Sequence, residues 1–547
     1  MRNIIIVGGV AGGASAAARL RRLDENARII MFERGEHISF ANCGLPYYIG
    51  GEITDKEDLT LQTPESFNAR FNVDVRVFHE VTAIDTAEKT VTVVDHSTGK
   101  NYKEAYDKLI LSPGAEPIKP SIEGIDSNKV FTLRNIPDTF KIKDYIDNNK
   151  PKSAAVVGGG YIGIEMVENL HNAGLNVTLI EMQNQIIAPL DYEMACSVHS
   201  YLRNKGIKLI LSNGVKAITD NSDYLNVKLN EGELETDMLI MAVGVRPESA
   251  LAKNAGLKLN ERGAIVVNDN MLTSDPNIYA VGDAVEVTDF VLGQKAFIPL
   301  AGPANKQGRI VADNICGYSS EYHGTQGSAI LKVFDMTVAA TGINEKTAKS
   351  LEIDYDKSYI YPSSHANYYP GAEMLSIKTI FEKSTGKILG AQIIGFDGAD
   401  KRCDVFAAAI RMGMTAHDLT KLELCYAPPY SSAKDPVNMA GYVIENLQTG
   451  KAKTFHWHDV KKLQNSNDVI LLDVRTPMEY ANNSINGFIN IPLDELRNRL
   501  GELDKTKPIY VTCMVGLRSY IAARILTQNG FDSYYLSGGQ MLYGNIV

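Results

Sequence analysis

The chain has 547 residues, of which 44% are hydrophobic and 22% are charged, with a formal net charge of -10. This length exceeds one hydrophobic core and predicts roughly three to four domains. The acidic balance argues against a surface that neutralises nucleic-acid phosphates or anionic lipids. The first apolar run, 4–7, is far shorter than a signal-peptide core, and no run approaches the ~20 residues that span a bilayer. We therefore expect a cytoplasmic protein without membrane insertion.

The cysteines are widely spaced, without a C-x-x-C pair or a cluster of metal ligands, so we expect neither a disulfide framework nor a metal site. Most of them are interpreted as inert thiols in helices or loops. They are Cys43, Cys196, Cys316, Cys403, Cys425 and Cys513.

A β-branched strand at 4–7 leads into a glycine-rich turn and an Ala-rich helix, and a second strand at 29–32 ends at Glu33. In such a unit the glycines let the backbone approach a pyrophosphate, the helix N-terminus faces its charge, and the acid binds ribose hydroxyls. One residue departs from the pattern, because Val10 occupies the place of the second glycine. The predicted turn contains Gly8, Gly9, Val10, Ala11 and Gly13.

The same pattern recurs with strands at 154–157 and 177–180, the second of which ends at Glu181. A carboxylate there would bond a free ribose 2′-hydroxyl and repel a 2′-phosphate. NADH is therefore favoured, and NADPH is the alternative. The residues predicted to bind are Gly158, Gly160, Tyr161, Ile162, Gly163 and Glu181.

Three further segments, 109–115, 241–247 and 277–284, read LILSPGA, MAVGVRP and NIYAVGDA. Together with the two glycine turns, they resemble the two-dinucleotide flavoprotein reductases over residues 1–447. The resemblance implies FAD on the first unit, with Glu33 at its ribose and Asp283 at its ribityl chain. It also implies a nicotinamide cofactor on the second unit and an interface domain that forms a homodimer.

Cys43 lies in the stretch SFANCGLPYYIGG, and Tyr48 stands where C-x4-C members of these reductases have a second cysteine. Cys43 would therefore form a mixed disulfide, a persulfide or a sulfenic acid with an external partner. We expect a lowered pKa of the Cys43 thiol, with the flavin stabilising the thiolate. The stretch resembles the single-cysteine coenzyme A-disulfide reductases, as do HANYYPG at 365–371 and YAPPYSSAKD at 426–435.

This resemblance implies that Tyr368 and Tyr426 reach the sulfur centre across a dimer interface, where their phenols could protonate a leaving thiolate. Packing of the interface alone is the other interpretation. The resemblance also implies coenzyme A contacts, because the phosphates of that substrate require cations. Two arginines three residues apart on a helix more often mark a solvated face. The implied contacts are Ser15, Arg19, Arg22, Ser39, Asn42 and Lys434.

The C-terminal part alternates short strands and helices, and Cys513 directly follows the strand at 509–512 in the loop CMVGLRS. Loop N–H groups, the following helix and Arg518 would surround the sulfur with positive potential. With LDVR at 472–475 and YYLSGG at 534–539, this part resembles a single-domain rhodanese, although Ser484 and Tyr543 replace a frequent histidine and tryptophan. The resemblance implies sulfur transfer at Cys513, and a scaffold role is the alternative.

The sequence thus predicts an α/β protein with two Rossmann-like FAD- and NAD-binding domains, an α+β dimerisation domain and a rhodanese-like α/β domain. The predicted segments are 1–113 and 244–322 for FAD, 114–243 for NAD(P), 323–447 for dimerisation, 448–454 as a linker and 455–547 as rhodanese-like. The predicted function is NADH-dependent reduction of coenzyme A persulfide, polysulfide or coenzyme A disulfide through Cys43, with sulfane sulfur handled at Cys513. The alternatives are a coenzyme A-disulfide reductase with an ancillary rhodanese end, an NADH oxidase or peroxidase with a Cys43 sulfenate, and a sulfurtransferase with a regulatory flavin half.

Overall fold

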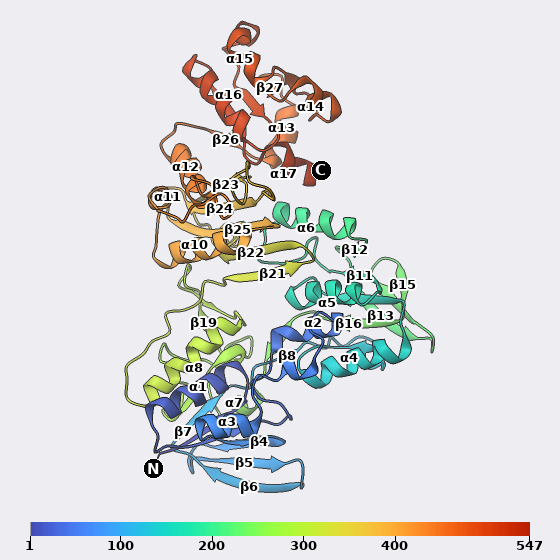
Figure 1. Ribbon diagram of the computed structural model, residues 1–547, viewed down its shortest axis with the longest axis vertical. Coiled ribbons are helices and arrows are strands. Elements are labelled where there is room, and N and C mark those ends of the chain that lie inside the picture. Colours follow the sequence, from blue (N-terminus) through green and yellow to red (C-terminus); the bar gives the residue numbers. More distant parts are fainter. Residues whose placement is uncertain (1, 547) are drawn as a thin grey trace. The chain divides into compact units, whose positions relative to one another are not determined.

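The computed structural model describes residues 2–546, which form two compact units (Figure 1). The first unit comprises 2–186 and 206–327, and the second comprises 187–205 and 328–546.

The first parallel sheet of the first unit has the strand order β18-β7-β1-β2-β3. Its central strand β1 is apolar on both faces, as expected for a parallel strand that is covered on both sides. Helices α1 (Ala11–Leu23) and α8 (Ala301–Ile315) pack closely, since a Cβ on Gly308 would lie 2.4 Å from the Gly12 carbonyl oxygen. The strands are β1 (Asn3–Val7), β2 (Arg28–Phe32), β3 (Asp74–Arg76), β7 (Lys108–Leu111) and β18 (Ile278–Ala280).

The second parallel sheet of this unit has the order β12-β11-β10-β16-β9, with α5 (Tyr161–Asn172) following its central strand. Its strands are β9 (Val130–Phe131), β10 (Ser153–Val157), β11 (Asn176–Ile180), β12 (Lys208–Ile210) and β16 (Met238–Met241). Two three-stranded antiparallel sheets contain β4 (His79–Asp85), β5 (Thr90–Asp95), β6 (Lys100–Ala105), β13 (Val215–Asp220), β14 (Leu225–Leu229) and β15 (Glu233–Thr236). The pair β8 (Ala115–Pro117) and β17 (Val245–Pro247) is also antiparallel, as is the pair β19 (Val287–Thr288) and β20 (Lys295–Ala296). The remaining helices are α2 (Leu45–Gly50), α3 (Pro64–Phe71), α4 (Ile136–Asn149) and α7 (Ala250–Asn254).

The second unit contains an antiparallel sheet in the order β21-β22-β25-β24-β23. The strand β25 (Ile388–Gly395) is buried along its whole length, because α10 (Ala399–Arg411) packs against it. The other strands are β21 (Ala329–Val333), β22 (Met336–Gly342), β23 (Tyr355–Ile360) and β24 (Ser376–Glu382). The other helices around this sheet are α6 (Tyr192–Asn204), α9 (Glu345–Ser350), α11 (Ala416–Thr420) and α12 (Pro436–Gln448).

A buried charge cluster ties α6 and α9 to this sheet. The Lys378 ammonium, fully buried on β24, lies 2.7 Å from carboxylate oxygens of Asp191 and Glu345 and also bonds to Glu193. Burial opposes the charge of Lys378, but the carboxylates of Glu193, Asp191 and Glu345 outweigh it and raise the pKa of the ammonium. The three acids lie close enough together to hold a metal ion, but the ammonium already bonds to all three, and we assign no metal site here.

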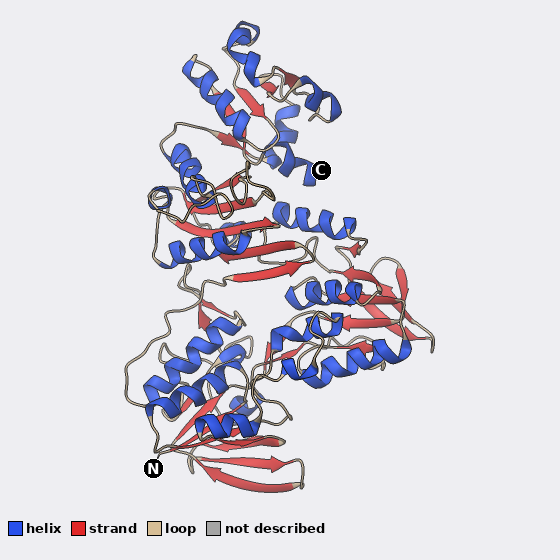
Figure 2. Ribbon diagram, in the orientation of Figure 1, coloured by secondary structure: helices blue, strands red, loops and turns tan. Residues whose placement is uncertain are grey.

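The C-terminal part of the second unit is a parallel sheet in the order β26-β30-β29-β27-β28, with helices on both faces (Figure 2). It is fixed to the antiparallel sheet, because the Tyr359 backbone N–H donates to Ser537 Oγ at 3.3 Å and the C-terminal helix packs on α6. The strands are β26 (Thr454–Phe455), β27 (Ile470–Asp473), β28 (Ile489–Asn490), β29 (Ile509–Thr512) and β30 (Ser533–Leu536). The helices are α13 (Val460–Gln464), α14 (Pro477–Asn482), α15 (Leu493–Arg499), α16 (Leu517–Gln528) and α17 (Gly539–Ile546).

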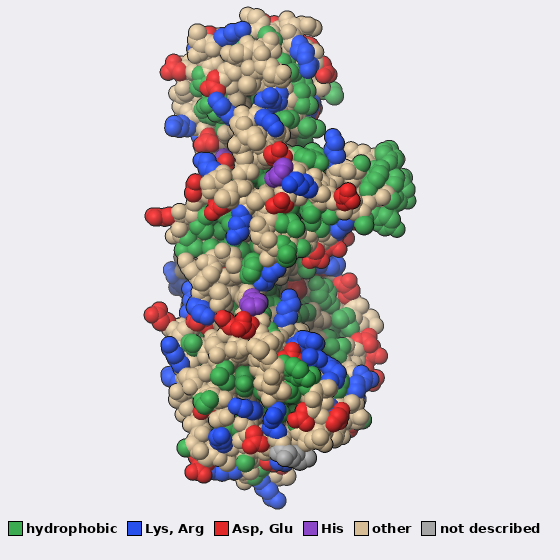
Figure 3. Space-filling view, turned by 90° about the vertical axis from the view of Figure 1, so that its left-hand side faces the viewer, with side chains coloured by type: hydrophobic (Ala, Val, Ile, Leu, Met, Phe, Trp, Pro, Cys, Tyr) green, Lys and Arg blue, Asp and Glu red, His purple; other side chains and the backbone are tan. Residues whose placement is uncertain are grey.

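Within residues 2–546, no helix combines the length and the apolar character needed to cross a membrane. On the face drawn in Figure 3, basic and acidic side chains are interspersed.

Candidate functional site

The two glycine turns are built alike at their first position. Gly8 has φ +97°, and a Cβ there would lie 2.1 Å from the Ser112 carbonyl oxygen at the end of β7. Gly158 has φ +106°, and its Cβ would lie 2.3 Å from the Ala242 carbonyl oxygen after β16. Only glycine fits a left-handed turn pressed against a neighbouring strand in this way.

The third glycine of each turn brings the helix against the strand. A Cβ on Gly13 would lie 2.0 Å from the Gly8 carbonyl oxygen, and one on Gly163 would lie 1.9 Å from that of Gly158. Both helices therefore begin directly over the carboxyl end of a strand, with their free N–H groups facing outward to an anion. Ala11 starts α1, and Tyr161 and Ile162 start α5.

Each turn is also bonded to the predicted acid at the end of the second strand. Glu33 Oε2 accepts from the Gly9 N–H at 3.1 Å, and Glu181 Oε2 accepts from the Gly159 N–H at 2.7 Å. These bonds fix both carboxylates beside the turns, where a ribose of a bound dinucleotide would lie.

The structure explains why the first turn tolerates valine. Val10 has φ -106° and the equivalent Gly160 has φ -78°, so both are in extended backbone that any residue adopts. No atom lies within 4 Å of a Cβ placed on Gly160. Folding therefore does not require glycine at the second position of either turn. In the second turn, Gly160 leaves room beside the helix N-terminus.

Asp283 lies in the turn after β18, as predicted. Burial raises the pKa of its carboxyl. Among the described residues it makes no hydrogen bond through its side chain. A half-buried acid without a partner fits the hydroxyl groups of a ribityl chain, which would supply hydrogen bonds to it.

Cys43 lies in a single 3-10 turn (Asn42–Gly44) directly before α2 and is exposed. Burial by neighbouring atoms, followed by the charges of Glu165 and Asp283, raises the pKa of its thiol. The protein residues alone therefore do not produce the lowered pKa that we expect from the sequence, because the charges facing the thiol are negative. Tyr48 packs its ring edge-on against Phe140 at 5.8 Å and is a structural side chain.

Glu165 is a residue of this site that the sequence analysis missed. It lies on α5, and burial, followed by the charge of Glu168, raises the pKa of its carboxyl to about 7. Burial raises the pKa of Tyr47, on α2, and the charge of Glu165 raises it further. The only signal in the sequence is an acid inside the otherwise apolar start of the second glycine helix.

Cys513 is fully buried at the end of β29, at the base of the predicted loop. Its Sγ accepts from the N–H groups of Gly516 and Ser519, both at 3.2 Å, and donates to Ser519 Oγ at 3.4 Å. Gly516 has φ +101°, which turns the loop back toward the sulfur. These N–H groups, at the start of α16, can hold negative charge on the sulfur.

Arg518 does not face the sulfur as a free cation. Its Nη1 and Nη2 atoms contact the two carboxylate oxygens of Glu479 at 2.8 and 2.6 Å. Glu479 was not among the predicted site residues, although the T-P-M-E pattern at 476–479 is a helix-capping signal that places it at the start of α14.

Comparison with known proteins matches residues 2–308 to the pyridine nucleotide-disulphide oxidoreductase family model. The chain belongs to this family. Residues 328–436 match the dimerisation domain of the same family, and residues 456–543 match the rhodanese-like domain. The predicted α/β fold class and the resemblance on which it rests are confirmed.

Similar proteins of this family cover most or all of the chain. A reduced CoADR-RHD protein of Bacillus anthracis is 55% identical, with a TM-score of 0.98, over 100% of this chain and 98% of that one. An NAD-dependent persulfide reductase from A. fulgidus is 38% identical, with a TM-score of 0.93, over 99% and 100%. Coenzyme A disulfide reductase of Staphylococcus epidermidis is 39% identical over 444 residues, which are 81% of this chain and 99% of the relative.

As a member of this family the protein is an oxidoreductase, and FAD and NADH are the cofactors of the family. The two glycine turns, their carboxylates and the unpartnered Asp283 fit two such dinucleotides.

The two tyrosines implied by the resemblance lie side by side in the second unit. Their hydroxyl oxygens are 2.8 Å apart, and both rings are exposed. The hydrogen bond to Tyr426 raises the pKa of Tyr368.

The residues implied for coenzyme A fall into three places. Ser15, Arg19 and Arg22 lie on one face of α1, where Arg19 is paired with Asp313 at 2.8 Å and Arg22 is exposed. Ser39 and Asn42 lie in the segment that leads to Cys43, and Lys434 is exposed before α12.

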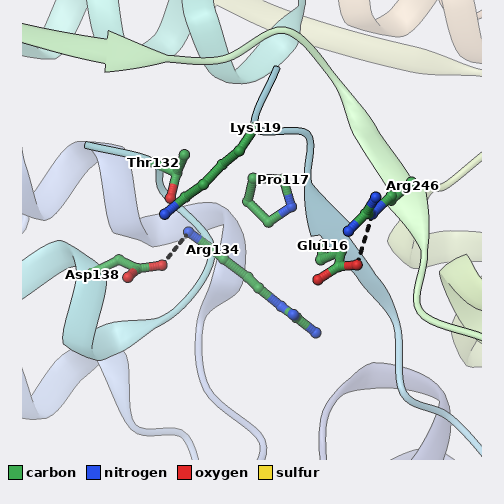
Figure 4. A pocket seen from close by; sticks show the side chains of 7 residues that line it. All are labelled: Glu116, Pro117, Lys119, Thr132, Arg134, Asp138 and Arg246. Atoms are coloured by element: carbon green, nitrogen blue, oxygen red, sulfur yellow. Dashed lines mark hydrogen bonds and ion pairs between the residues drawn. The ribbon is translucent and has the colours of Figure 1, made fainter. Parts of the chain in front are cut away.

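A separate cavity of about 340 Å³ lies in the first unit, beside β8 and β17 (Figure 4). Lys119, Arg134 and Arg246 line it, but Arg246 is paired with Glu116 and Arg134 with Glu248. It contains none of the predicted site residues, and we assign no role to it.

Proposed function

We propose that this protein is an FAD-containing, NADH-dependent reductase of sulfur–sulfur bonds. Its proposed substrates are coenzyme A persulfide, polysulfide and coenzyme A disulfide. The observation that carries the proposal is the accessible Cys43 with a packed Tyr48 in place of a second cysteine, because the partner sulfur must then come from the substrate. The named activities of the persulfide reductase and the coenzyme A disulfide reductase support it.

Glycine turns and acids in the first unit would hold the cofactors. Gly8, Gly13 and Glu33 would bind FAD together with Asp283, and Gly158, Gly160, Gly163 and Glu181 would bind NADH. When bound, FAD and NADH supply the electron pair that reduces the sulfur on Cys43. Glu181 favours NADH, because its carboxylate would repel the 2′-phosphate of NADPH.

Cys43 would attack the outer sulfur of a persulfide RSSH. The bond between the two substrate sulfurs breaks, RS⁻ leaves, and Cys43 carries the persulfide CysSSH. Two electrons then convert CysSSH to the Cys43 thiolate and HS⁻. With a coenzyme A disulfide, the same attack gives a mixed disulfide and one free thiolate, and two electrons with a proton release the second thiol.

We propose that Tyr368 and Tyr426 donate protons to leaving thiolates at this centre. The support is their mutual hydrogen bond, which leaves one hydroxyl hydrogen of the exposed pair available. Their position at Cys43 depends on a homodimer, which we propose from the dimerisation domain model. Ser15, Arg19, Arg22, Ser39, Asn42 and Lys434 are the proposed coenzyme A contacts.

At the other end of the chain, we propose that Cys513 accepts sulfane sulfur and passes it to a small thiol carrier. The loop N–H groups that surround its Sγ support this role.

We also propose that the domain boundaries are those predicted from the sequence. The proposed location of the protein is the cytoplasm. The support for the location is that every cysteine from Cys43 to Cys513 is a free thiol in the described structure.

Anaerobic steady-state NADH oxidation tests the function, with coenzyme A persulfide and coenzyme A disulfide as substrates. Cys43→Ser should abolish the activity with both, and Cys425→Ser, which removes another exposed thiol, should not. Activity that survives Cys43→Ser contradicts the proposal. Activity that requires oxygen or peroxide instead of sulfur substrates supports the oxidase or peroxidase alternative.

A further inference from the structure

Arg518, the cation of the Cys513 loop, is neutralised by a carboxylate that is itself held in place by a second residue. Glu479 pairs bidentately with Arg518, and its Oε2 also accepts from the N–H and the Oγ1–H of Thr476 at 3.0 and 2.8 Å. The hydrogen bond from Arg518, more than any other effect, lowers the pKa of Glu479 to about 2. The carboxylate is therefore ionised at neutral pH and cannot easily move away from the guanidinium.

The second arginine of this region is also neutralised. Arg475 is 1% exposed and bonds to Asp473 at 2.8 Å, and Gln540 donates to the same carboxylate. Within residues 2–546, no lysine and no other arginine side chain forms a hydrogen bond with the Cys513 loop. The N–H groups of Gly516 and Ser519 are the groups left to hold negative charge at the sulfur.

Sulfur donors differ in the charge that this loop must accommodate. With thiosulfate, the Cys513 thiolate takes the outer sulfur, the S–S bond breaks, and sulfite leaves with two negative charges. With an organic persulfide RSSH, the same attack releases RS⁻, which carries one negative charge at the reacting sulfur. The phosphates of a coenzyme A persulfide lie at the far end of its pantetheine arm, away from this sulfur. A fixed carboxylate close to the loop penalises the sulfonate donor more strongly, because like charges repel in proportion to their charge.

We propose that Glu479 is the specificity-determining residue of the Cys513 site, and that it selects persulfides with an organic thiolate leaving group over sulfonate donors such as thiosulfate. The inference rests on the proposed sulfur transfer at Cys513.

Exposed apolar residues that are neighbours of the ion pair in the sequence agree with an organic leaving group. Met478, next to Glu479, is 74% exposed, and Leu517, next to Arg518, is 59% exposed. Ile521 lies one turn after Leu517 on the same face of α16 and is 36% exposed. Exposed apolar side chains of this kind can contact the carbon chain of an organic persulfide and offer no hydrogen bond to a sulfonate oxygen.

The test uses the full-length, FAD-loaded enzyme without NADH, mixed with coenzyme A persulfide or thiosulfate. Formation of the Cys513 persulfide is followed by rapid quenching and peptide mass spectrometry. The wild type should react faster with coenzyme A persulfide. In Glu479→Gln the second-order rate constant with thiosulfate should rise roughly tenfold, since one nearby negative charge is removed, without an equal rise for coenzyme A persulfide. The control is Glu495→Gln, which removes a carboxylate from the exposed pair with Arg499.

Equal changes for both donors in Glu479→Gln, or faster reaction of the wild type with thiosulfate, would overturn the inference. If Glu479→Gln does not fold, Met478→Ser at an exposed position serves instead and should slow only the persulfide reaction. An equal effect of Met478→Ser on both donors contradicts the inference. If neither donor labels Cys513 while NADH-dependent reduction at Cys43 persists, the sulfur transfer itself is refuted and the inference with it.

Discussion

The chemistry of Cys43 depends on the negative side chains that face it. Burial, followed by the charges of Glu165 and Asp283, raises the pKa of the thiol, and burial also raises the pKa of Glu165 to about 7. Near neutral pH Glu165 therefore changes between a neutral neighbour and a charge that opposes the thiolate. Lowering of the thiol pKa must come from bound cofactor or from loss of these charges.

Glu165→Gln should therefore lower the pKa of Cys43, because it removes the first charge that raises it. The pH profile of Cys43 alkylation by iodoacetamide should shift to lower pH. The matched control is Glu88→Gln at an exposed turn, which should leave the profile unchanged. An unshifted profile in Glu165→Gln would show that this carboxyl does not act on the thiol.

The sequence predicts the sulfur-bearing residues but not the acids that act on them. Cys43 and Cys513 stand in contiguous motifs that can be recognised by inspection. Glu479 contacts Arg518 from 39 positions away, and Glu165 acts on Cys43 from another helix, so no local pattern records either contact.

At the scale of single elements, the second glycine turn contains one glycine that folding requires and one that leaves space for binding. Gly163 has no space for a side chain, because its Cβ would lie 1.9 Å from a backbone oxygen, whereas Gly160 has open space. The order of strand, turn and helix was predictable from the sequence. The difference in space at these two glycines was not predictable from the sequence, because it depends on the distance to the preceding turn and on backbone angles.

Gly163→Ala should destabilise the protein by about 1–3 kcal/mol, because the helix must move away from the strand. Gly160→Ala should change stability by less than about 0.5 kcal/mol, yet weaken NADH binding by filling the space beside the helix N-terminus. Thermal unfolding and NADH titration of both variants check this. Similar loss of stability in the two variants would contradict the distinction.

The Lys378 cluster holds α6 and α9 on the antiparallel sheet. Lys378→Met should cost about 3–5 kcal/mol at pH 7, because three buried carboxylates lose their cation. Lys349→Met removes an exposed partner of the same Glu345 and should cost less than about 1 kcal/mol.

The stability lost in Lys378→Met should depend on pH in one direction. Burial opposes the charge of Glu345, but Lys378 and Lys357 outweigh it and hold the pKa of the carboxyl below its usual value. The stabilisation is therefore present above the ordinary glutamate pKa of about 4.3 and is lost as pH falls through the lowered value. The difference in unfolding midpoint between wild type and Lys378→Met should shrink at acidic pH, and a constant difference would contradict a charge-based role.

At the scale of the whole molecule, two sulfur sites occupy one chain. The rhodanese-like sheet is anchored within the second unit through Ser537 and α17, and Cys513 is fully buried. We therefore expect a diffusible thiol, such as coenzyme A, to carry sulfur away from Cys513. Placing both sites in one chain raises the effective concentration of one near the other.

Cys513→Ser should spare NADH-dependent reduction of supplied coenzyme A persulfide and abolish the transfer of polysulfide-derived sulfur to a thiol. NADH oxidation and persulfide formation, measured separately on this variant, check the division of labour. Loss of both activities in a folded variant would show that the two sites do not act separately.

The most direct test of the central claim is a single anaerobic turnover of NADH-reduced enzyme with equimolar coenzyme A persulfide. We predict that sulfide and free coenzyme A form in equal amounts in the wild type and in Cys513→Ser, and that neither forms in Cys43→Ser. A reduced enzyme that yields no sulfide from the persulfide, but is reoxidised through Cys43 by peroxide or oxygen, would contradict the account.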